Sequence, residues 1–360
     1  MRPLPIAALA LGGFAALAVA GSAYDWELPR GFPVPRVPAD NPMSAAKVLL
    51  GRYLFYDART SVNGTMSCAS CHRQRLAFAD GRSRPAGATG EFLKRRAMSL
   101  VNVAYASVLT WSRPSLRSLE QQVLVPLLTG EPRELGIGGR PEELIRVLRM
   151  DSVYQPLFHH AFPDERDPFT IQNASKAIAS FERSIVSARS PYDRYRYGEP
   201  NAISDSAKRG ELLFFSAPVA ACYRCHGGFD FSDAVDCVGC APGPIPFHNN
   251  GLYNLPGALS YPPFGLGIYE FTGRPEDVGK FKAPTLRNIA LIAPYMHDGS
   301  IPTLEAVIDH YASGGRKNPN QDERVRPLPL TAQNRRDLLE FLQSLTDEEL
   351  TRDPRFANPW

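Results

Sequence analysis

The 360-residue chain has no block of like charge, and its 40 Lys and Arg against 37 Asp and Glu give a formal net charge of +3. A near-neutral chain without a basic stretch does not point to nucleic acid as a partner. Beyond residue 20 no apolar run approaches the length of a membrane span. Strand-like alternation of apolar and polar residues is also scarce. The sequence therefore predicts a mainly α-helical fold with long loops and no stable membrane insertion.

The amino terminus has the three parts of a secretory signal. A charged start at Met1-Arg2 leads into an apolar run over 6–20, and the small residues Gly21-Ser22-Ala23 follow. This order predicts a signal peptide over residues 1–23, cleaved on export, so that the mature chain lies in the periplasm. An uncleaved anchor is the alternative, although the run is short for a span.

Cysteines are few, and four of the six stand in two copies of one pattern. Cys68-Ala69-Ser70-Cys71-His72 and Cys222-Tyr223-Arg224-Cys225-His226 both read C-x-x-C-H, the pattern of c-type haem attachment. Two thiols on one helical turn can add across the two vinyl groups of a porphyrin, and the next histidine then lies under the iron. Two structural disulfides are the alternative, but they leave both histidines unexplained. We therefore expect two covalently bound haem c groups, haem 1 on His72 and haem 2 on His226.

The remaining two cysteines form a third C-x-x-C. Cys237-Val238-Gly239-Cys240 is followed by Ala241 instead of histidine, so no haem is expected there. An oxidising compartment favours a local disulfide between Cys237 and Cys240. A metal site is the alternative.

An internal repeat divides the mature chain. The matching segments are Gly51–Tyr56 and Gly210–Phe215 before the haem motifs, Ser99–Asn102 and Thr285–Asn288 after them, and amphipathic helices expected over 177–187 and 331–345. Each half thus has a helix, a haem motif, a long loop and a closing helix. This plan predicts two tandem cytochrome c-like domains, with haem 1 in 24–200 and haem 2 in 201–360.

The two halves differ where the far face of each iron is expected. Alignment on Leu119 and Leu304 places Pro126 opposite Tyr311. Proline cannot ligate iron, whereas a tyrosine phenol can. Haem 1 is therefore expected to be five-coordinate with an open site, and haem 2 to be closed by His226 and Tyr311. The alternative ligands of haem 2 are Met296, His297 and His310.

An open iron beside a closed one suggests that peroxide reacts at haem 1 and that haem 2 stores the second oxidising equivalent. This chemistry needs a proton carrier beside the open iron. Glu134 is the candidate, with Glu131 as the alternative. Gln122 could hold peroxide or water by hydrogen bonds, or only pack. Trp111 is a large, oxidisable aromatic between the motifs and suits a relay between the haems, although most tryptophans only pack.

Longer motifs resemble a known family. Phe281-Lys282-Ala283-Pro284-Thr285-Leu286-Arg287-Asn288 and Pro294-Tyr295-Met296-His297-Asp298-Gly299 look like segments of bacterial di-haem cytochrome c peroxidases and the related MauG enzymes. Peroxidases of this group usually ligate haem 2 with methionine at the position of Tyr311, whereas MauG-type enzymes have tyrosine there. The chain therefore resembles the MauG side. The segments 169–173, 179–183, 190–195 and 247–254 further resemble the MbnH di-haem enzymes of methanobactin operons.

The resemblance implies roles for several residues. Trp111 matches the inter-haem tryptophan, and Glu134 and Gln122 match the distal-pocket acid and glutamine. MauG enzymes reach a state with both irons oxidised to Fe(IV) and then oxidise a tryptophan on a partner protein. MbnH enzymes similarly convert a tryptophan of a copper-binding partner to kynurenine. Phenolate ligation by Tyr311 is in keeping with this chemistry, because an anionic oxygen stabilises high-valent iron better than a thioether does.

The resemblance also implies calcium between the haems, and here the chain departs from the family pattern. The family ion uses an asparagine side chain and backbone carbonyls, which would fall at Ile292 and Pro294. The asparagine position falls near Arg96, where no good ligand stands. Calcium therefore lacks one of its expected ligands in this chain.

These features predict a periplasmic di-haem oxidoreductase. It would react with hydrogen peroxide at haem 1, share the oxidising equivalents with haem 2 through Trp111, and oxidise a tryptophan on a secreted partner such as a copper-binding protein. The alternative is a peroxidase that reduces hydrogen peroxide to water with electrons from a small cytochrome or copper protein. A plain electron carrier is a third reading, and it requires both irons to be six-coordinate.

Overall fold

The computed structural model describes residues 24–130, 133–241, 243–257 and 259–360. In these ranges helices alternate with long loops, and extended pairing is limited to isolated bridges. The expectation of a mainly helical fold is therefore confirmed. The expected signal peptide over 1–23 and the alternative acid Glu131 lie outside the described residues. None of the described helices combines the length and the apolar character that crossing a bilayer requires.

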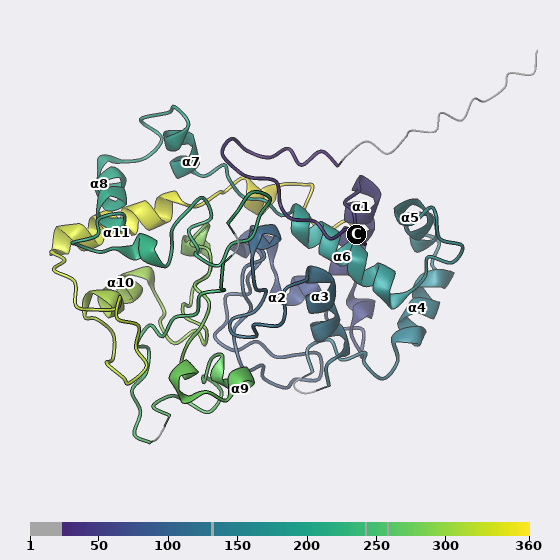
Figure 1. Cartoon of the computed structure of the whole chain (residues 1–360). Helices are drawn as coiled ribbons and strands as arrows, with labels where there is room; N and C mark the ends of the chain where they lie inside the picture. Colours follow the sequence, from purple (N-terminus) through teal and green to yellow (C-terminus); the bar gives the residue numbers. More distant parts are fainter. Residues whose placement is uncertain (1–23, 131–132, 242, 258) are drawn as a thin grey trace, which may run out of the picture.

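The helices fall into two groups (Figure 1). The α-helices are α1 Ala45–Tyr56, α2 Cys68–Cys71, α3 Leu119–Leu128, α4 Pro141–Met150, α5 Tyr154–Ala161, α6 Ile171–Ser184, α7 Pro191–Arg196, α8 Asp205–Phe214, α9 Tyr269–Thr272, α10 Leu304–Ala312 and α11 Ala332–Ser344. Short 3-10 turns cover Ala58–Thr60, Gln74–Leu76, Val103–Tyr105, Cys222–Arg224, Pro275–Asp277, Ile289–Leu291 and Leu350–Arg352. Helices α1 to α6 gather on one side, and α8, α10 and α11 gather on the other.

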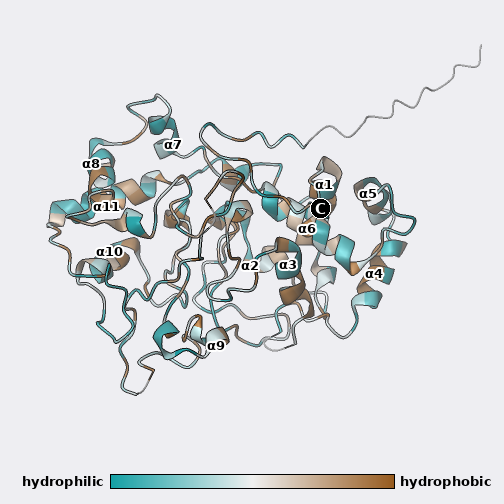
Figure 2. Cartoon of the chain, in the orientation of Figure 1, coloured by the Kyte–Doolittle hydropathy of each residue, from teal (hydrophilic) through white to brown (hydrophobic). Residues whose placement is uncertain are grey.

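The closing helices differ slightly from the prediction. Helix α11 matches it closely, with Thr331 as the capping residue. Helix α6 begins six residues earlier than expected, because the Thr170 hydroxyl accepts a hydrogen bond from the backbone N–H of Asn173 and starts the helix there. It ends at Ser184 instead of residue 187. Surface helices such as α4 show one hydrophilic and one hydrophobic face (Figure 2), as packing against a core requires.

Each half is built on a pair of helices that meet at a glycine. In the first half α1 packs on α6, and a Cβ atom on Gly51 would lie 1.9 Å from the carbonyl oxygen of Ala177. In the second half α8 packs on α11, and a Cβ atom on Gly210 would lie 1.9 Å from the carbonyl oxygen of Asp337. The glycine of the repeated segment therefore allows the two backbones to touch.

Replacing Gly51 with alanine is expected to destabilise the haem-loaded protein by about 1–3 kcal/mol, because the added methyl group forces α1 away from α6. Urea unfolding followed by circular dichroism measures this change. Gly139→Ala is the matched control, since a Cβ atom there has no neighbour within 4 Å. Equal unfolding midpoints for Gly51→Ala and the control would show that the helix crossing is not tight.

The internal repeat is confirmed in the backbone conformation. Asn102 and Asn288 both adopt the left-handed region, with φ of 57° and 59°, and both precede a 3-10 turn. Their backbone N–H groups donate to equivalent residues at the ends of the closing helices, Ile185 at 2.9 Å and Leu345 at 3.0 Å. Each half thus fastens its loop to its closing helix in the same way.

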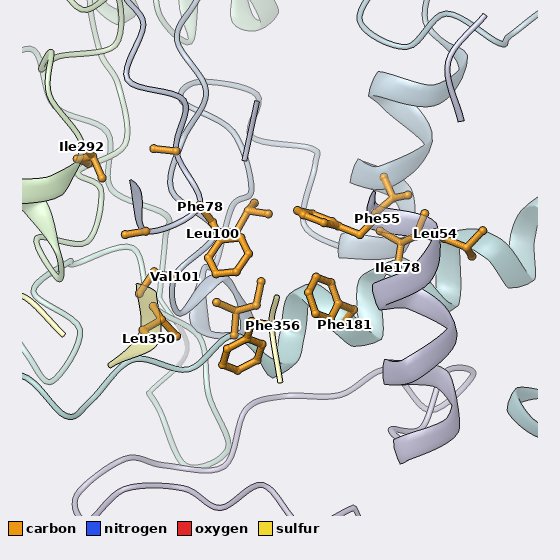
Figure 3. Close-up of a cluster of buried hydrophobic side chains, with 14 of the residues drawn as sticks. Leu54, Phe55, Phe78, Leu100, Val101, Ile178, Phe181, Ile292, Leu350 and Phe356 are labelled. Atoms are coloured by element: carbon orange, nitrogen blue, oxygen red, sulfur yellow. The ribbon is translucent and has the colours of Figure 1, made fainter. Parts of the chain in front are cut away.

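Aromatic side chains fill the core of the first half (Figure 3). The rings of Phe55 on α1 and Phe181 on α6 lie 5.1 Å apart. Phe356 packs on both Phe78 and Phe181 at 6.3 Å, and its carbonyl accepts the Tyr56 hydroxyl at 2.6 Å. The carboxyl-terminal tail, which follows the second half in sequence, therefore returns to the first half.

The third C-x-x-C forms the expected local disulfide between Cys237 and Cys240, whose Cα atoms lie 5.1 Å apart. The carbonyl of Cys237 accepts a hydrogen bond from Arg36 of the Pro-rich amino-terminal arm at 2.9 Å. The disulfide therefore fixes the loop on which this arm rests.

Candidate functional site

The first haem motif is organised around His72. Cys68 and Cys71 bound α2, and His72 follows as its capping residue. The ring Nδ1 of His72 donates to the carbonyl of Phe78 at 2.8 Å, which leaves Nε2 free for a metal. Ala77 and Phe78 have positive φ angles of 49° and 58°, a conformation that turns this carbonyl back toward the ring. Burial lowers the pKa of His72 and favours the neutral, ligating form.

The second haem motif repeats this arrangement. Nδ1 of His226 donates to the carbonyls of Phe231 at 3.2 Å and Pro284 at 3.1 Å. Phe231 again has a positive φ, of 49°. Burial lowers the pKa of His226 as it does that of His72. Both histidines are therefore oriented by backbone carbonyls, as metal-bound histidines usually are.

Hydroxyl groups lock the two loops that orient the histidines. The Ser99 hydroxyl donates to the carbonyl of Ala77, and the Thr285 hydroxyl donates to that of Asp230, both at 2.6 Å. Each acceptor directly precedes the residue whose carbonyl orients a histidine. Ser99 and Thr285 are the first residues of a repeated segment, so the repeat preserves this support.

The four motif cysteines carry free thiols in the structure: Cys68, Cys71, Cys222 and Cys225. Two pairs of free thiols, each followed by a neutral histidine with a free Nε2, fit two haem groups.

Trp111 lies where the two halves meet. Its indole Nε1 donates to the carbonyl of Arg96 in the first half at 3.1 Å. Its own carbonyl accepts the backbone N–H of Lys282 from the second half at 2.9 Å. Trp111 packs against the small hydrophobic cluster formed by Tyr261, Val278 and Phe281. We call Arg96, Trp111, Lys282 and the loop 292–297 the inter-half seam.

Glu134 is placed near the first haem motif. The side chain is half-buried, and burial raises the pKa of its carboxyl group. Its charge in turn contributes to the raised pKa of Cys68 and of Cys71 in this motif. The carbonyl of Pro126 in α3 accepts the backbone N–H of Leu135 at 2.9 Å and so fixes the loop that contains Glu134. Gln122 lies on α3 and is half-buried.

Tyr311 lies on α10 and is half-buried. Burial, with a smaller contribution from nearby Cys225 and Cys222, raises the pKa of its hydroxyl group to about 12. The Asn250 amide donates to this hydroxyl at 3.4 Å. The same amide lies 3.3 Å from the sulfur of Met296. The Asn250 amide therefore lies beside both Tyr311, the ligand expected for haem 2, and Met296, one of the alternative ligands.

The two alternative histidines have other contacts. Nε2 of His310 donates to the backbone carbonyl of Asn250 at 3.0 Å. The ring of His297 stacks on Phe281 with 3.8 Å between centroids. Burial lowers the pKa of His297 to about 4, so the ring is neutral at physiological pH.

Sequence reasoning missed two buried groups near the haem motifs. Glu182 on α6 has a carboxylate oxygen with no hydrogen-bond partner among the described residues, and burial raises its pKa to about 8. His248 lies between Asp233 at 2.7 Å and Asp322 at 2.9 Å. Burial opposes the charge on His248, but these two hydrogen bonds outweigh it and raise the pKa to about 11.

His248, Asp233 and Cys225 place their potential ligand atoms within 4.8 Å of one another, as a metal site would. Cys225, however, belongs to a haem attachment motif. A thioether bond to haem would use this sulfur, so the cluster does not offer an independent metal site.

The chain is similar to several known proteins. A family model described as di-haem cytochrome c peroxidase matches residues 45–201. The chain is similar to the methylamine utilization protein MauG of Methylorubrum extorquens, with 34% identity over 313 residues that cover 86% of this chain and 81% of that protein. It is also similar to cytochrome-c peroxidase IdrP1 of Pseudomonas sp. (strain SCT), with 35% identity over 333 residues that cover 88% and 85%. A solved structure of a MauG-like protein associated with microbial copper homeostasis has a TM-score of 0.91 and 43% identity, and the match covers 94% of this chain and 100% of that one.

Proposed function

Since this chain belongs to the di-haem cytochrome c peroxidase and MauG family of peroxide-dependent oxidoreductases, we propose that it uses hydrogen peroxide to oxidise a tryptophan of a secreted partner protein in the periplasm. The residues that would hold the haem groups are Cys68, Cys71 and His72 for haem 1, and Cys222, Cys225, His226 and Tyr311 for haem 2. When bound, the two haem groups would supply the reactivity toward peroxide and hold the oxidising equivalents.

The observation that carries the proposal is the difference between two equivalent helix positions. Helices α3 and α10 begin at the matching residues Leu119 and Leu304. Seven residues further on, α3 presents Pro126 and α10 presents Tyr311. Proline offers no iron ligand at this position, whereas the phenol of Tyr311 could ligate haem 2. Such asymmetry supports a reactive centre beside a storage centre.

Tyr311 suits a storage role because its oxygen can bind iron as a phenolate. Burial raises the pKa of the Tyr311 hydroxyl group to about 12, so the phenol would have to lose its proton to ligate iron. The Asn250 amide donates to this oxygen and so favours its anionic form. An anionic oxygen ligand lowers the cost of removing electrons from the iron.

Protons and electrons need separate routes. We assign Glu134 to proton transfer at peroxide; its neighbour Leu135 donates a backbone hydrogen bond to the carbonyl of Pro126. We assign Gln122 to holding the bound peroxide by hydrogen bonds. Trp111 touches both halves and is the group we assign to electron transfer between the haems. The copper homeostasis named for the similar structure leads us to propose a copper-binding protein as the partner.

A second function has specific support from Met296. Its sulfur lies as close to the Asn250 amide as the Tyr311 oxygen does. If Met296 were the iron ligand, haem 2 would accept electrons from a small cytochrome or copper protein, and the chain would reduce peroxide to water.

Carbon monoxide and partner modification together test the proposal. We expect the ferrous protein to bind one carbon monoxide for every two haems, because only haem 1 is open. After peroxide treatment with the partner, mass spectrometry should show one added oxygen atom on a partner tryptophan. Tyr311→Met should keep carbon monoxide binding at haem 1 and lose partner oxidation. Rapid peroxide consumption with reduced cytochrome c and an unmodified partner would instead identify a detoxifying peroxidase.

A further inference from the structure

Two backbone carbonyls of the second half point at one side chain of the first half. The guanidinium of Arg96 donates from Nη1 to the carbonyl of Pro294 and from Nη2 to that of Ile292. Arg96 is only 4% exposed. These are the two carbonyls at which the family resemblance implies calcium.

The residues present do not fit a calcium ion. Calcium takes six to eight oxygen ligands, usually with carboxylates among them. Here guanidinium nitrogens already bind the two carbonyl oxygens that the ion would need. A guanidinium is always charged in proteins, and a second cation beside it would be repelled. The guanidinium of Arg96 therefore occupies the place of the ion and supplies the positive charge there.

We infer that Arg96 is a built-in cation that replaces calcium at the inter-half seam and positions Trp111. Besides its guanidinium contacts, its backbone N–H donates to the carbonyl of His297 at 3.2 Å. Its backbone carbonyl accepts the indole N–H of Trp111 at 3.1 Å. Arg96 therefore joins the loop 292–297 to Trp111. Because Arg96 is part of the polypeptide, this connection cannot dissociate as a bound ion can.

The charge of Arg96 has a buried counterpart. Burial lowers the pKa of Arg96, and the carboxylate of Asp80 opposes that shift. Asp80 is itself buried and also acts on the pKa of Cys71 and His72. Arg96 contacts no reacting atom, so it is a positioning residue.

Calcium content tests the replacement without reference to the proposed function. The isolated di-haem protein should contain far less than one calcium ion per chain. Adding a chelator should leave its haem spectrum unchanged and shift its melting temperature by less than about 1 °C, since removing an unbound ligand cannot change stability. Wild-type protein that contains one calcium per chain, and whose haem spectrum changes when a chelator removes it, would overturn the inference.

A substitution can restore the metal site. Arg96→Asn removes the guanidinium and supplies an amide oxygen, so it should bind about one calcium per chain and become sensitive to chelators. Arg95→Gln is the matched control, because Arg95 pairs with Glu270 and leaves the two carbonyls untouched. Equal calcium binding by Arg96→Asn and the control would count against the inference. If Arg96→Asn does not fold, the wild-type measurement decides.

The positioning role has its own readout, which rests on the proposed function. In Arg96→Met, transfer of oxidising equivalents from haem 1 to haem 2 after peroxide addition should slow by about tenfold to a hundredfold, because the backbone at residue 96, whose carbonyl holds the Trp111 indole, loses its side-chain anchor to Ile292 and Pro294. Arg96→Lys should recover part of this rate, and carbon monoxide binding at haem 1 should stay unchanged in both. A transfer rate in Arg96→Met equal to wild type would overturn the positioning role. It would leave the calcium result standing.

Discussion

Replacing Glu134 with glutamine is expected to slow the reaction of haem 1 with hydrogen peroxide by roughly a hundredfold to ten-thousandfold, the usual contribution of a general acid or base. The amide has the shape of the carboxyl group but cannot take the proton from the first peroxide oxygen or return it to the second. Stopped-flow absorption of the haem after mixing with peroxide measures this rate. Carbon monoxide binding should not change, because the open site itself remains.

The pH dependence of the same reaction gives an independent check. Burial raises the pKa of Glu134 above that of a free glutamate. A general base works only when deprotonated, so the wild-type rate should rise with pH through this raised pKa and level off above it. Glu134→Gln should lack that rise, because its side chain does not titrate. A rise that persists unchanged in Glu134→Gln would assign the proton transfer to another group.

Glu131 provides the matched comparison. It lies three residues before Glu134 and is the other acid that the sequence offers. If Glu131→Gln abolishes the peroxide reaction and Glu134→Gln does not, the assignment of Glu134 is wrong. The burial of Glu134 is the reason to expect the opposite, since a carboxyl group with a raised pKa is a better base near neutral pH.

Features that depend on local spacing could be read from the sequence. The C-x-x-C-H pattern fixes two thiols and a histidine on one turn, and both copies form compact turns in the structure. The repeat is also local, since each copy keeps its glycine, its hydroxyl and its asparagine at matching places. Gly51 and Gly210 show why: both occupy a point where two helix backbones touch.

Features that depend on distant contacts could not be read in this way. Arg96 could be recognised as a poor calcium ligand, but nothing in its neighbourhood in sequence reveals that its guanidinium reaches carbonyls almost 200 residues later. His248 likewise gains its charge from Asp322, which lies 74 residues away. The start of α6 was misjudged for a different reason, because the cap formed by Thr170 lies outside the apolar pattern.

The ligand of haem 2 stands between these cases. Alignment of the two halves of the sequence places Tyr311 opposite Pro126. The helices that contain them, α10 and α3, begin at the aligned residues Leu304 and Leu119. The structure adds that Met296 approaches the same Asn250 amide from a loop with a positive φ of 70° at the methionine. Register could not foresee this, because Met296 comes from a different segment. Tyr311 therefore stays a prediction, tested by Tyr311→Met.

Replacing Trp111 with phenylalanine is expected to lower oxidation of the partner by at least about tenfold, which corresponds to about 1.4 kcal/mol or more on the barrier. Phenylalanine keeps the packing beside Phe281 but is much harder to oxidise than an indole. It also lacks the N–H group that donates to Arg96. In the wild type, the backbone carbonyl of Arg96 accepts this N–H and so stabilises the positive charge of the one-electron-oxidised indole. Mass spectrometry of the partner tryptophan over time measures the loss.

Trp360→Phe is the matched control for this experiment. Trp360 is 53% exposed and packs on Tyr53, away from the inter-half seam, so the same substitution there should leave partner oxidation unchanged. The first reaction with peroxide should remain fast in both variants, because neither residue is assigned a part in that reaction. If Trp111→Phe oxidises the partner as fast as Trp360→Phe does, the indole is a packing residue and electrons pass between the halves by another route. If the peroxide reaction itself fails in Trp111→Phe, the substitution has damaged haem 1, and Trp111 acts on the structure of the seam instead of on electron transfer.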